Sequence, residues 1–511
     1  MGSSEPAAGT GPAPRGSTLR RAGTAVGASL LALLLIAAAL VLWPAPDAPL
    51  PAPGRDLVLA NVHVIDVERG IAGPSSSVTI RAGVIKAIGP PPAGHGLPVL
   101  DGGGGYLLPG FWDMHTHSFQ LSPQLHLPLF VANGVTSVRD MMDCPGDADS
   151  LIACLPDKRR WTTAAERGRM ASPRFVSIAS YYFEDPALTP ADASARARRY
   201  AARGLDELKV YNRLSRPAYL RVAEEARRSG MRLTGHLPAA ISLEEALAAG
   251  QRSFEHAHLL VRHCYGRSEA WRSGRLRQVP ATRLAVAMVA GHDSRRCRRA
   301  YAAMRDAGAW FVPTHVTREE DARAGDPAFL DDPRLAFLDP LSRWAYRDDL
   351  AGTRARYPGR DGAEALDRYF RHGLRLTGEA YRAGVPVLVG TDTALGGFRY
   401  HDEMALLAHA GLSPAQILRA ATLDAARFAG LERGAGSVSV GKRADLVLLD
   451  ANPLENIAHT RRIRLVLLAG RPYDRRQLDR LLDFTRRQAS SPANWMKLLW
   501  GFARSSVAAD L

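Results

Sequence analysis

The stretch YLLPGFWDMHTH, residues 106–117, decides how the rest of this 511-residue chain is interpreted. It begins as an apolar run typical of a β-strand and ends in Asp113, His115 and His117. Side chains two residues apart in an extended chain point to the same side. The two imidazoles would therefore face one point, as metal ligands must. The stretch predicts a strand that ends at a metal site.

Eight strand-like runs, including this one, alternate with helix-like segments, several of which are closed by Gly. Such alternation predicts parallel strands, and eight of them predict a (β/α)₈ barrel with its chemistry at the strands' C-terminal ends. Two long excursions, roughly 259–309 and 317–380, should lie over the barrel mouth. The candidate strands are 106–115, 134–140, 173–180, 205–211, 231–236, 251–256, 310–316 and 385–392.

The predicted strand ends carry the residues from which a metal site is built. Lys209, one of only five lysines, lies in the fourth strand, and His236, His256 and Asp392 lie at the ends of the fifth, sixth and eighth. A single His at a strand end is more often an ordinary polar core residue. Four His, one Lys and one Asp on one barrel rim instead indicate a functional site.

This order of residues resembles the amidohydrolase superfamily, in particular its imidazolonepropionase-like and its membrane or exported prolidase-like members. The resemblance runs from about residue 56 to residue 475 and is more specific to the superfamily than to a substrate. It rests on LLPGFWDMHTH, GVTSVRDM, DELKVY, TGH, AGQRSFEH, GTDT and LSPAQILRAATLDAARFAGLERGAGSVSVGKRADLVLLDANPLENI.

The resemblance also explains two strand-rich pieces that flank the barrel, at 56–89 and 436–472. In this family the returning strands join the first ones in a composite sheet. The expected fold class is therefore α/β: a TIM-type barrel with a small composite β-sheet (sandwich) domain, preceded by one transmembrane helix. In chain order, the expected segments are a cytoplasmic tail (1–21), a membrane anchor (22–43), a Pro-rich linker (44–55), the first part of the composite sheet (56–105), the barrel (106–433), the second part of the sheet (434–475) and a helical tail (476–511).

The resemblance implies a binuclear metal site that hydrolyses amide or peptide-like C–N bonds through a metal-bridging hydroxide. Imidazole and carboxylate donors suit Zn²⁺ and do not exclude Mn²⁺, Fe²⁺ or Co²⁺. Small substrates such as dipeptides or N-acyl amino acids are expected, with Asp392 as the proton acceptor. The implied ligands are His115, His117 and Asp392 for the deeper ion, His236 and His256 for the outer ion, and carboxylated Lys209 as the bridge.

Two further residues are candidates for substrate contact. Tyr211 lies two residues beyond Lys209, on the same side of the strand, and prolidase-like relatives use a tyrosine here. Arg139 ends the second strand and could pair with a substrate carboxylate, although an ion pair with Asp140 or Asp143 is the favoured interpretation. The roles of three other rim histidines stay open: His258, His315 and His401.

The N-terminus predicts a membrane anchor. Residues 22–43 carry no charge, and as a helix they span about 33 Å, enough for a bilayer core. The run is long for a secretory signal, and Arg15, Arg20 and Arg21 precede it, so the tail should stay cytoplasmic and the barrel be exported. Four cysteines fit that compartment. Of their three pairings we prefer the two local ones, Cys144 with Cys154 and Cys264 with Cys297, over free thiols.

The net charge of +15 comes from 66 Lys and Arg against 51 Asp and Glu. No dense basic stripe interleaved with aromatic residues occurs, so nucleic acid is not an expected partner. The expected partners are a small-molecule or short-peptide substrate and the membrane, with the oligomeric state open. Two other functions stay in view: hydrolysis of a cyclic amide or lactone or a deamination, and a non-catalytic barrel that acts as a scaffold or binding protein.

Overall fold

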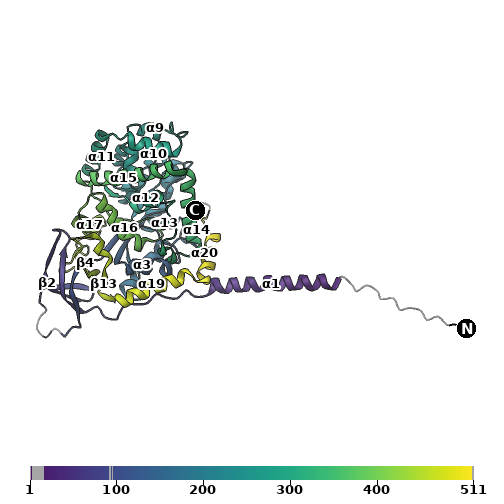
Figure 1. Ribbon diagram of the computed structural model, residues 1–511, viewed down its shortest axis with the longest axis horizontal. Coiled ribbons are helices and arrows are strands. Elements are labelled where there is room, and N and C mark those ends of the chain that lie inside the picture. The colour runs from purple at the N-terminus through teal and green to yellow at the C-terminus, as the bar shows by residue number, and fades with distance from the viewer. Residues whose placement is uncertain (1, 3–15, 91–93, 95, 509–511) are drawn as a thin grey trace.

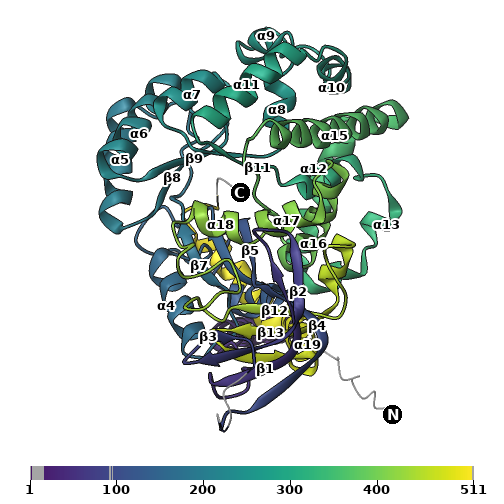
Figure 2. The ribbon, with the colours of Figure 1, turned by 90° about the vertical axis from the view of Figure 1, so that its left-hand side faces the viewer.

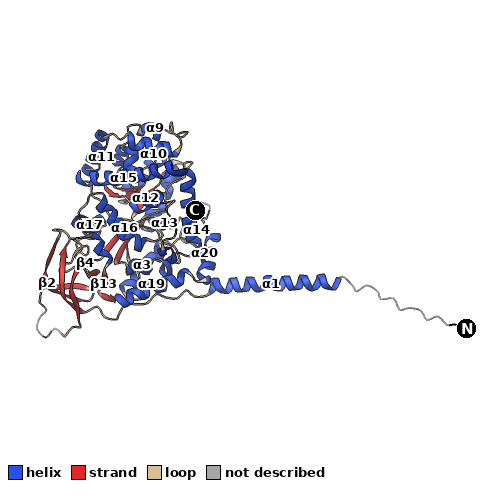
Figure 3. Ribbon diagram, viewed as in Figure 1, coloured by secondary structure: helices blue, strands red, loops and turns tan. Residues whose placement is uncertain are grey.

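The computed structural model describes Gly2 and residues 16–90, 94 and 96–508 of the chain. A long helix, α1 (Gly16–Leu42), projects from the body of the molecule, which consists of a helix-rich part and a β-sheet at its lower edge (Figures 1 and 3). The segment Ala25–Leu42 of α1 is long and apolar enough to cross a membrane. None of it is buried against the rest of the protein.

One seven-stranded sheet joins strands from both ends of the described chain, as the sequence predicts. Its order is β14-β13-β12-β4-β1-β2-β3. β1 runs parallel to β4, and β12 pairs antiparallel with the other edge of β4. Its strands are β1 (Leu57–Asp66), β2 (Ile71–Arg81), β3 (Val84–Ile88), β4 (Val99–Pro109), β12 (Leu446–Leu449), β13 (Ile463–Leu468) and β14 (Arg471–Asp474).

The strand expected at 436–450 is shorter than predicted. Only β12 is extended, because Gly436 and Gly441 take positive φ angles of 80° and 89° and form turns before the strand.

The run 106–115 is likewise divided between two sheets. β4 ends at Pro109, and β5 begins at Phe111 in the barrel. Gly110 makes the transition possible, since a Cβ at this position would lie 2.1 Å from Thr136 Oγ1.

The barrel contains seven regular strands and an eighth, irregular one. Short parallel sheets and isolated bridges connect successive strands. The eighth, at 385–392, has only a bridge from Val387 to Phe311, but it closes the ring because Met114 N donates to Val389 O and Asp392 N donates to His115 O. The regular strands are β5 (Phe111–Thr116), β6 (Val135–Asp140), β7 (Arg174–Ile178), β8 (Glu207–Val210), β9 (Arg232–Gly235), β10 (Ser253–Glu255) and β11 (Trp310–Val312).

Helices surround these strands, and Figure 2 shows them as an outer ring. The sequence marks their ends clearly: Ser242 and Glu245 form a capping box at the start of α7, and Gly250 closes it with a φ of 99°. The helices between the first six barrel strands are α2 (Ser122–Leu125), α3 (Leu127–Ala132), α4 (Leu155–Glu166), α5 (Pro190–Arg203), α6 (Arg216–Ser229) and α7 (Leu243–Ala249). Those that follow the eighth strand are α16 (Gly396–His409), α17 (Pro414–Ala420) and α18 (Leu423–Phe428).

The two long excursions are mostly helical. The first follows β10 and the second follows β11, as predicted. They contain α8 (His258–His263), α9 (Ser268–Arg272), α10 (Ala281–Ala290) and α11 (Ser294–Asp306), then α12 (His315–Ala322), α13 (Pro327–Leu330), η1 (Pro333–Phe337), α14 (Pro340–Arg356) and α15 (Gly359–Arg382). The remaining helices of the described residues are the short turn η2 (Ile457–Arg461), α19 (Arg475–Ala489) and α20 (Pro492–Arg504).

Both predicted disulfides are confirmed. Cys144 bonds Cys154 in the loop after β6, and Cys264 at the end of α8 bonds Cys297 in α11. The second bond joins residues 33 positions apart and cross-links the end of α8 to α11 within the first excursion.

Candidate metal centre

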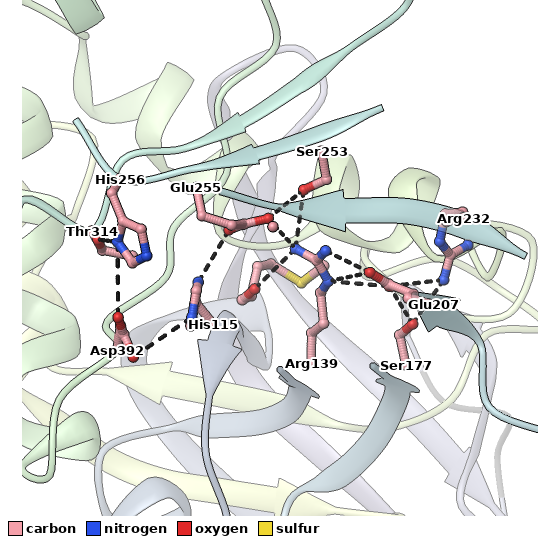
Figure 4. Close-up of polar contacts among 12 residues, drawn as sticks. His115, Arg139, Ser177, Glu207, Arg232, Ser253, Glu255, His256, Thr314 and Asp392 are labelled. Atoms are coloured by element: carbon pink, nitrogen blue, oxygen red, sulfur yellow. Dashed lines mark hydrogen bonds and ion pairs between the residues drawn. The ribbon is translucent and has the colours of Figure 1, made fainter. Parts of the chain in front are cut away.

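Three of the predicted ligands, His115, His117 and Asp392, converge at the C-terminal ends of β5 and the eighth strand. Asp392 Oδ1 lies 3.1 Å from His117 Nε2. The same oxygen lies 3.5 Å from His115 Nε2 (Figure 4). Ligand atoms of these three residues all lie within 4.8 Å of one another. Asp392 has a φ of 50°, an angle that costs a non-glycine residue about 1–3 kcal/mol and persists where the surroundings impose it.

A second pair of imidazoles lies beside the first group. The Nε2 atoms of His236 and His256 are 2.9 Å apart. On their other sides, His236 Nδ1 contacts Asn212 Oδ1 at 2.9 Å and His256 Nδ1 contacts Thr314 Oγ1 at 2.8 Å. Each ring therefore has Nδ1 fixed by a neighbour and Nε2 turned inward, which is how metal-binding imidazoles are usually held.

His115 completes this pattern. Its Nδ1 lies 3.1 Å from Glu255 Oε2, while its buried Nε2 has no hydrogen-bond partner among the described residues. Burial lowers the pKa of His256 to about 3 and that of His236 well below its usual value, so both rings are neutral. Neutral imidazoles with an inward nitrogen and a nearby carboxylate fit a divalent metal ion.

Lys209 lies on β8 and is almost completely buried. It lines the same cavity as His117, His236 and Asp392. Burial lowers the pKa of its amine to about 8, although the Asp392 and Glu255 carboxylates oppose that shift. All six predicted ligand positions thus occur together at one end of the barrel.

The cavity has a volume of about 460 Å³. Tyr211 is part of its wall, with its ring 3.9 Å from the His236 ring and 4.9 Å from the Tyr182 ring. Burial raises the pKa of Tyr211 well above its usual range, so its hydroxyl stays protonated. The rest of the wall includes the apolar side chains of Phe119, Leu129, Phe130 and Met142, together with the polar side chains of Thr116, His126, Glu184 and Thr393.

Arg139 does not lie where a substrate-binding arginine would. Its guanidinium is completely buried beneath the metal centre, donates to Glu207 Oε1 and Oε2 at 3.1 Å, and donates to Glu255 Oε1 at 3.1 Å (Figure 4). The expected alternative partners are not used either, because Lys158 pairs with Asp140 at 2.8 Å and lies 3.6 Å from Asp143. Both interpretations of Arg139 are corrected: it is held by two buried carboxylates from other strands.

The three rim histidines have different positions. The His258 ring stacks on His256 with centroids 5.5 Å apart, so it borders the centre. His315 Nε2 bonds Thr377 Oγ1 at 3.0 Å within the protein interior. His401 lies between Thr460 Oγ1 at 3.0 Å and Asn133 O at 3.1 Å. Neither His315 nor His401 lines the cavity.

Three residues that orient the ligands were not recognised in the sequence: Asn212, Glu255 and Thr314. Glu255 and Asn212 directly adjoin the recognised His256 and Tyr211, but alternation assigns a neighbouring side chain to the opposite face. His256 and Thr314 escape this rule, since they have φ angles of 72° and 44°. The local sequence does not predict the positive φ angles at His256 and Thr314.

The model of the amidohydrolase family matches residues 106–472. Ochratoxinase of Aspergillus niger is 35% identical over 79 residues, a stretch that spans 15% of this chain and 16% of that enzyme. Three solved structures share the fold. Bottromycin amidohydrolase has a TM-score of 0.63 and 23% identity, and the match covers 86% of this chain and 92% of that one. A Xaa-Pro dipeptidase with bound methionine has a TM-score of 0.56 and 18% identity, with coverage of 82% and 100%, and A. niger ochratoxinase has a TM-score of 0.55 and 17% identity, with coverage of 84% and 96%.

Since the family model covers well over half of the chain, including every predicted ligand, the chain belongs to the amidohydrolase family.

Proposed function

We propose that this protein is a metal-dependent hydrolase of amide or peptide-like C–N bonds. The observation that carries the proposal is the convergence of four histidines, Lys209 and Asp392. His117, Lys209, His236 and Asp392 line one cavity, and His115 and His256 contact Asp392 and His236 beside it. The buried His115 Nε2 makes no hydrogen bond among the described residues. A scaffold protein would have no need to retain this set. The proposed assignment places His115, His117 and Asp392 on one divalent ion and His236 and His256 on a second.

Lys209 is proposed as the carboxylated bridge between the two ions. An amine with a pKa of about 8 is partly neutral near neutral pH, and the neutral nitrogen can add to CO₂. The new N–C bond gives a carbamate anion and releases one proton. A carbamate oxygen suits a dication, whereas an ammonium would be repelled by it. The donor set suits Zn²⁺, with Mn²⁺, Fe²⁺ and Co²⁺ as alternatives.

A bound metal pair would supply a hydroxide near neutral pH and polarise the scissile carbonyl. The chain's own residues would handle the proton and the substrate. Burial alone would raise the pKa of Asp392, but His115 and His117 hold it well below its usual range. Asp392 is therefore an anion that can accept a proton and pass it to the leaving nitrogen. The protonated Tyr211 hydroxyl can donate to a substrate oxygen.

The cavity supports a small substrate with an apolar part, such as a dipeptide or an N-acyl amino acid. Its polar end holds the metal centre, and its apolar walls would accept a side chain or acyl group. Structural relatives that are a Xaa-Pro dipeptidase and an amidohydrolase also support a substrate with an amide or peptide bond. Those similarities by themselves establish the fold alone.

We propose that α1 anchors the protein with its barrel on the extracytoplasmic side of the membrane. The length and composition of Ala25–Leu42 support a membrane span. The arginines that precede the span favour a cytoplasmic N-terminus. Two disulfides suit an oxidising compartment.

The test is metal content by plasma mass spectrometry on the full chain in detergent, together with Lys209→Ala. We expect about two equivalents per chain, largely lost in the variant, and a fall of at least about 100-fold in dipeptide or N-acyl amino acid hydrolysis. Lys86→Ala is the matched control, because this exposed lysine lies on β3 in the composite sheet. One equivalent that is insensitive to Lys209 would favour a mononuclear deaminase or a cyclic-amide hydrolase. No metal in folded protein would overturn the proposal.

A further inference from the structure

Helix α20 has apolar residues on two faces. One face, formed by Asn494, Leu498 and Gly501, is buried against the protein. On the other face the exposed fractions are 37% for Trp495, 49% for Leu499, 51% for Trp500 and 38% for Phe502. A helix on the surface of a soluble protein usually presents charged or polar residues there. Large exposed apolar patches instead mark contact with a partner or a membrane.

The position of α20 is fixed relative to α1. Lys497 Nζ donates to Leu40 O at 3.2 Å, in the last turn of α1, and also to the carbonyl oxygen of Trp43, the residue that follows α1. Such terminal carbonyls carry the negative end of the helix dipole, so the ammonium stabilises the junction. On the barrel side, Ser150 Oγ donates to Gly501 O at 2.8 Å. Helix α20 is thus held at the base of the proposed span.

A second helix extends the same surface. Helix α14 contacts α20, and its Trp344 side chain is 63% exposed. Figure 1 shows α14 and α20 on the side of the body from which α1 projects. Trp43, at the end of α1, is 66% exposed. Tryptophan is the residue most typical of the boundary between a bilayer and water.

Charge on this side also suits a lipid surface. The guanidinium of Arg504, at the end of α20, lies 5.4 Å above the Trp500 ring, whereas the Lys497 ammonium is already bound by the carbonyls of Leu40 and Trp43. A cation beside interfacial aromatic rings is favoured by anionic headgroups.

We infer that Trp344, Trp495, Leu499, Trp500 and Phe502 form a docking face that inserts into the headgroup region of the bilayer. The barrel then rests on the membrane instead of moving freely on its anchor. The inference rests on the proposed span of α1 and is independent of the proposed hydrolysis.

Docking also has a consequence for the cavity. Phe119 lines the metal-site cavity, and the next residues, Gln120 and Leu121, line the hollow where Val41 of α1 meets α20. The docked protein would therefore hold one wall of its cavity close to the lipid.

The experiment uses the full chain in nanodiscs of phosphatidylethanolamine and phosphatidylglycerol. A bimane fluorophore is attached to Leu499→Cys, and Trp500→Cys provides a second position if the first variant does not fold. Val286→Cys is the control, since Val286 is an exposed apolar residue, at 42%, on α10 and α10 lies far from α1 (Figure 1). Quenching is measured with lipids brominated on their acyl chains and, separately, with aqueous iodide.

We expect brominated lipid to remove more than about half of the fluorescence at position 499 and little at position 286, with the reverse order for iodide. Iodide quenching at position 499 equal to that at position 286 would overturn the docking face. Protection from both quenchers would assign the face to a protein partner or a second copy, and would also overturn it. A chain that fails to enter nanodiscs would refute the span itself. Because no readout depends on metal or turnover, failure here is distinct from failure of the proposed hydrolysis.

Discussion

Glu255 contacts His115 with one carboxylate oxygen and Arg139 with the other, both at 3.1 Å. The orientation of a proposed metal ligand is thereby linked to a buried ion pair beneath the barrel mouth. Arg139 in turn contacts Glu207, which also pairs with Arg232 at 3.1 Å. Figure 4 shows this chain of contacts from the metal centre to the strand starts. We therefore propose Arg139 as a positioning residue that acts through Glu255.

The first prediction concerns this contact. In Glu255→Gln an amide replaces the carboxylate that holds His115 Nδ1, so metal affinity should fall about 10- to 100-fold. Chelator competition on purified full chain measures this change. Glu364→Gln, on the exposed part of α15, is the control and should leave affinity unchanged. Equal affinities for both variants would mean that Glu255 does not orient the ligand.

The second prediction separates structure from substrate binding at Arg139. Arg139→Ala removes the arginine that pairs with buried Glu255 and leaves Glu207 with Arg232 alone, so the free energy of unfolding should fall by about 3–5 kcal/mol. Urea denaturation measures this loss. Arg360→Ala, at a side chain that is 90% exposed, should change stability by less than about 0.5 kcal/mol. A stable Arg139→Ala protein with a raised KM only for substrates that carry a carboxylate would instead restore a substrate role.

The third prediction is a pH dependence of stability. Burial alone would raise the pKa of Glu207, but Arg139 and Arg232 outweigh it and lower the pKa to about 2. The unfolded chain binds the proton near the ordinary value of 4.5, which is higher. The unfolded state therefore binds more protons in this window, so stability falls as pH drops from about 5 to about 2.

Each titrating group of this kind contributes up to about 1.4 kcal/mol per pH unit. Glu207→Gln should remove its part of the slope in urea denaturation curves, and also lower stability at neutral pH. Glu269→Gln, on the exposed side of α9, should retain the full slope. An unchanged slope in Glu207→Gln would show that Glu207 titrates normally in the folded protein.

The sequence predicted the barrel, the composite sheet and the six-residue set, because each depends on local information. Apolar strand-like runs identify the barrel strands, period-two alternation identifies strands of the composite sheet, and a rare lysine or an H-x-H pair stands out at the barrel strand ends. The partners of Arg139 could not be predicted in this way. Glu207 and Glu255 lie 68 and 116 residues away in the sequence, and only barrel closure brings them to it. Nearness in sequence favours Asp140 and Asp143 as partners of Arg139, but in the structure both carboxylates lie beside Lys158.

The last prediction concerns Tyr211, which we propose as a contact for the substrate. Its ring is held between His236 and Tyr182, so removal of the hydroxyl should leave the wall of the cavity in place. Tyr211→Phe should therefore raise KM by about tenfold, the equivalent of one hydrogen bond of about 1.4 kcal/mol, with metal content unchanged. Steady-state kinetics with dipeptides and N-acyl amino acids, alongside metal analysis, measure both quantities. Tyr106→Phe, in the composite sheet, is the control and should alter neither. If Tyr211→Phe lowers kcat and leaves KM unchanged, the hydroxyl acts on the transition state rather than on substrate binding. If neither constant changes, Tyr211 serves only as part of the wall.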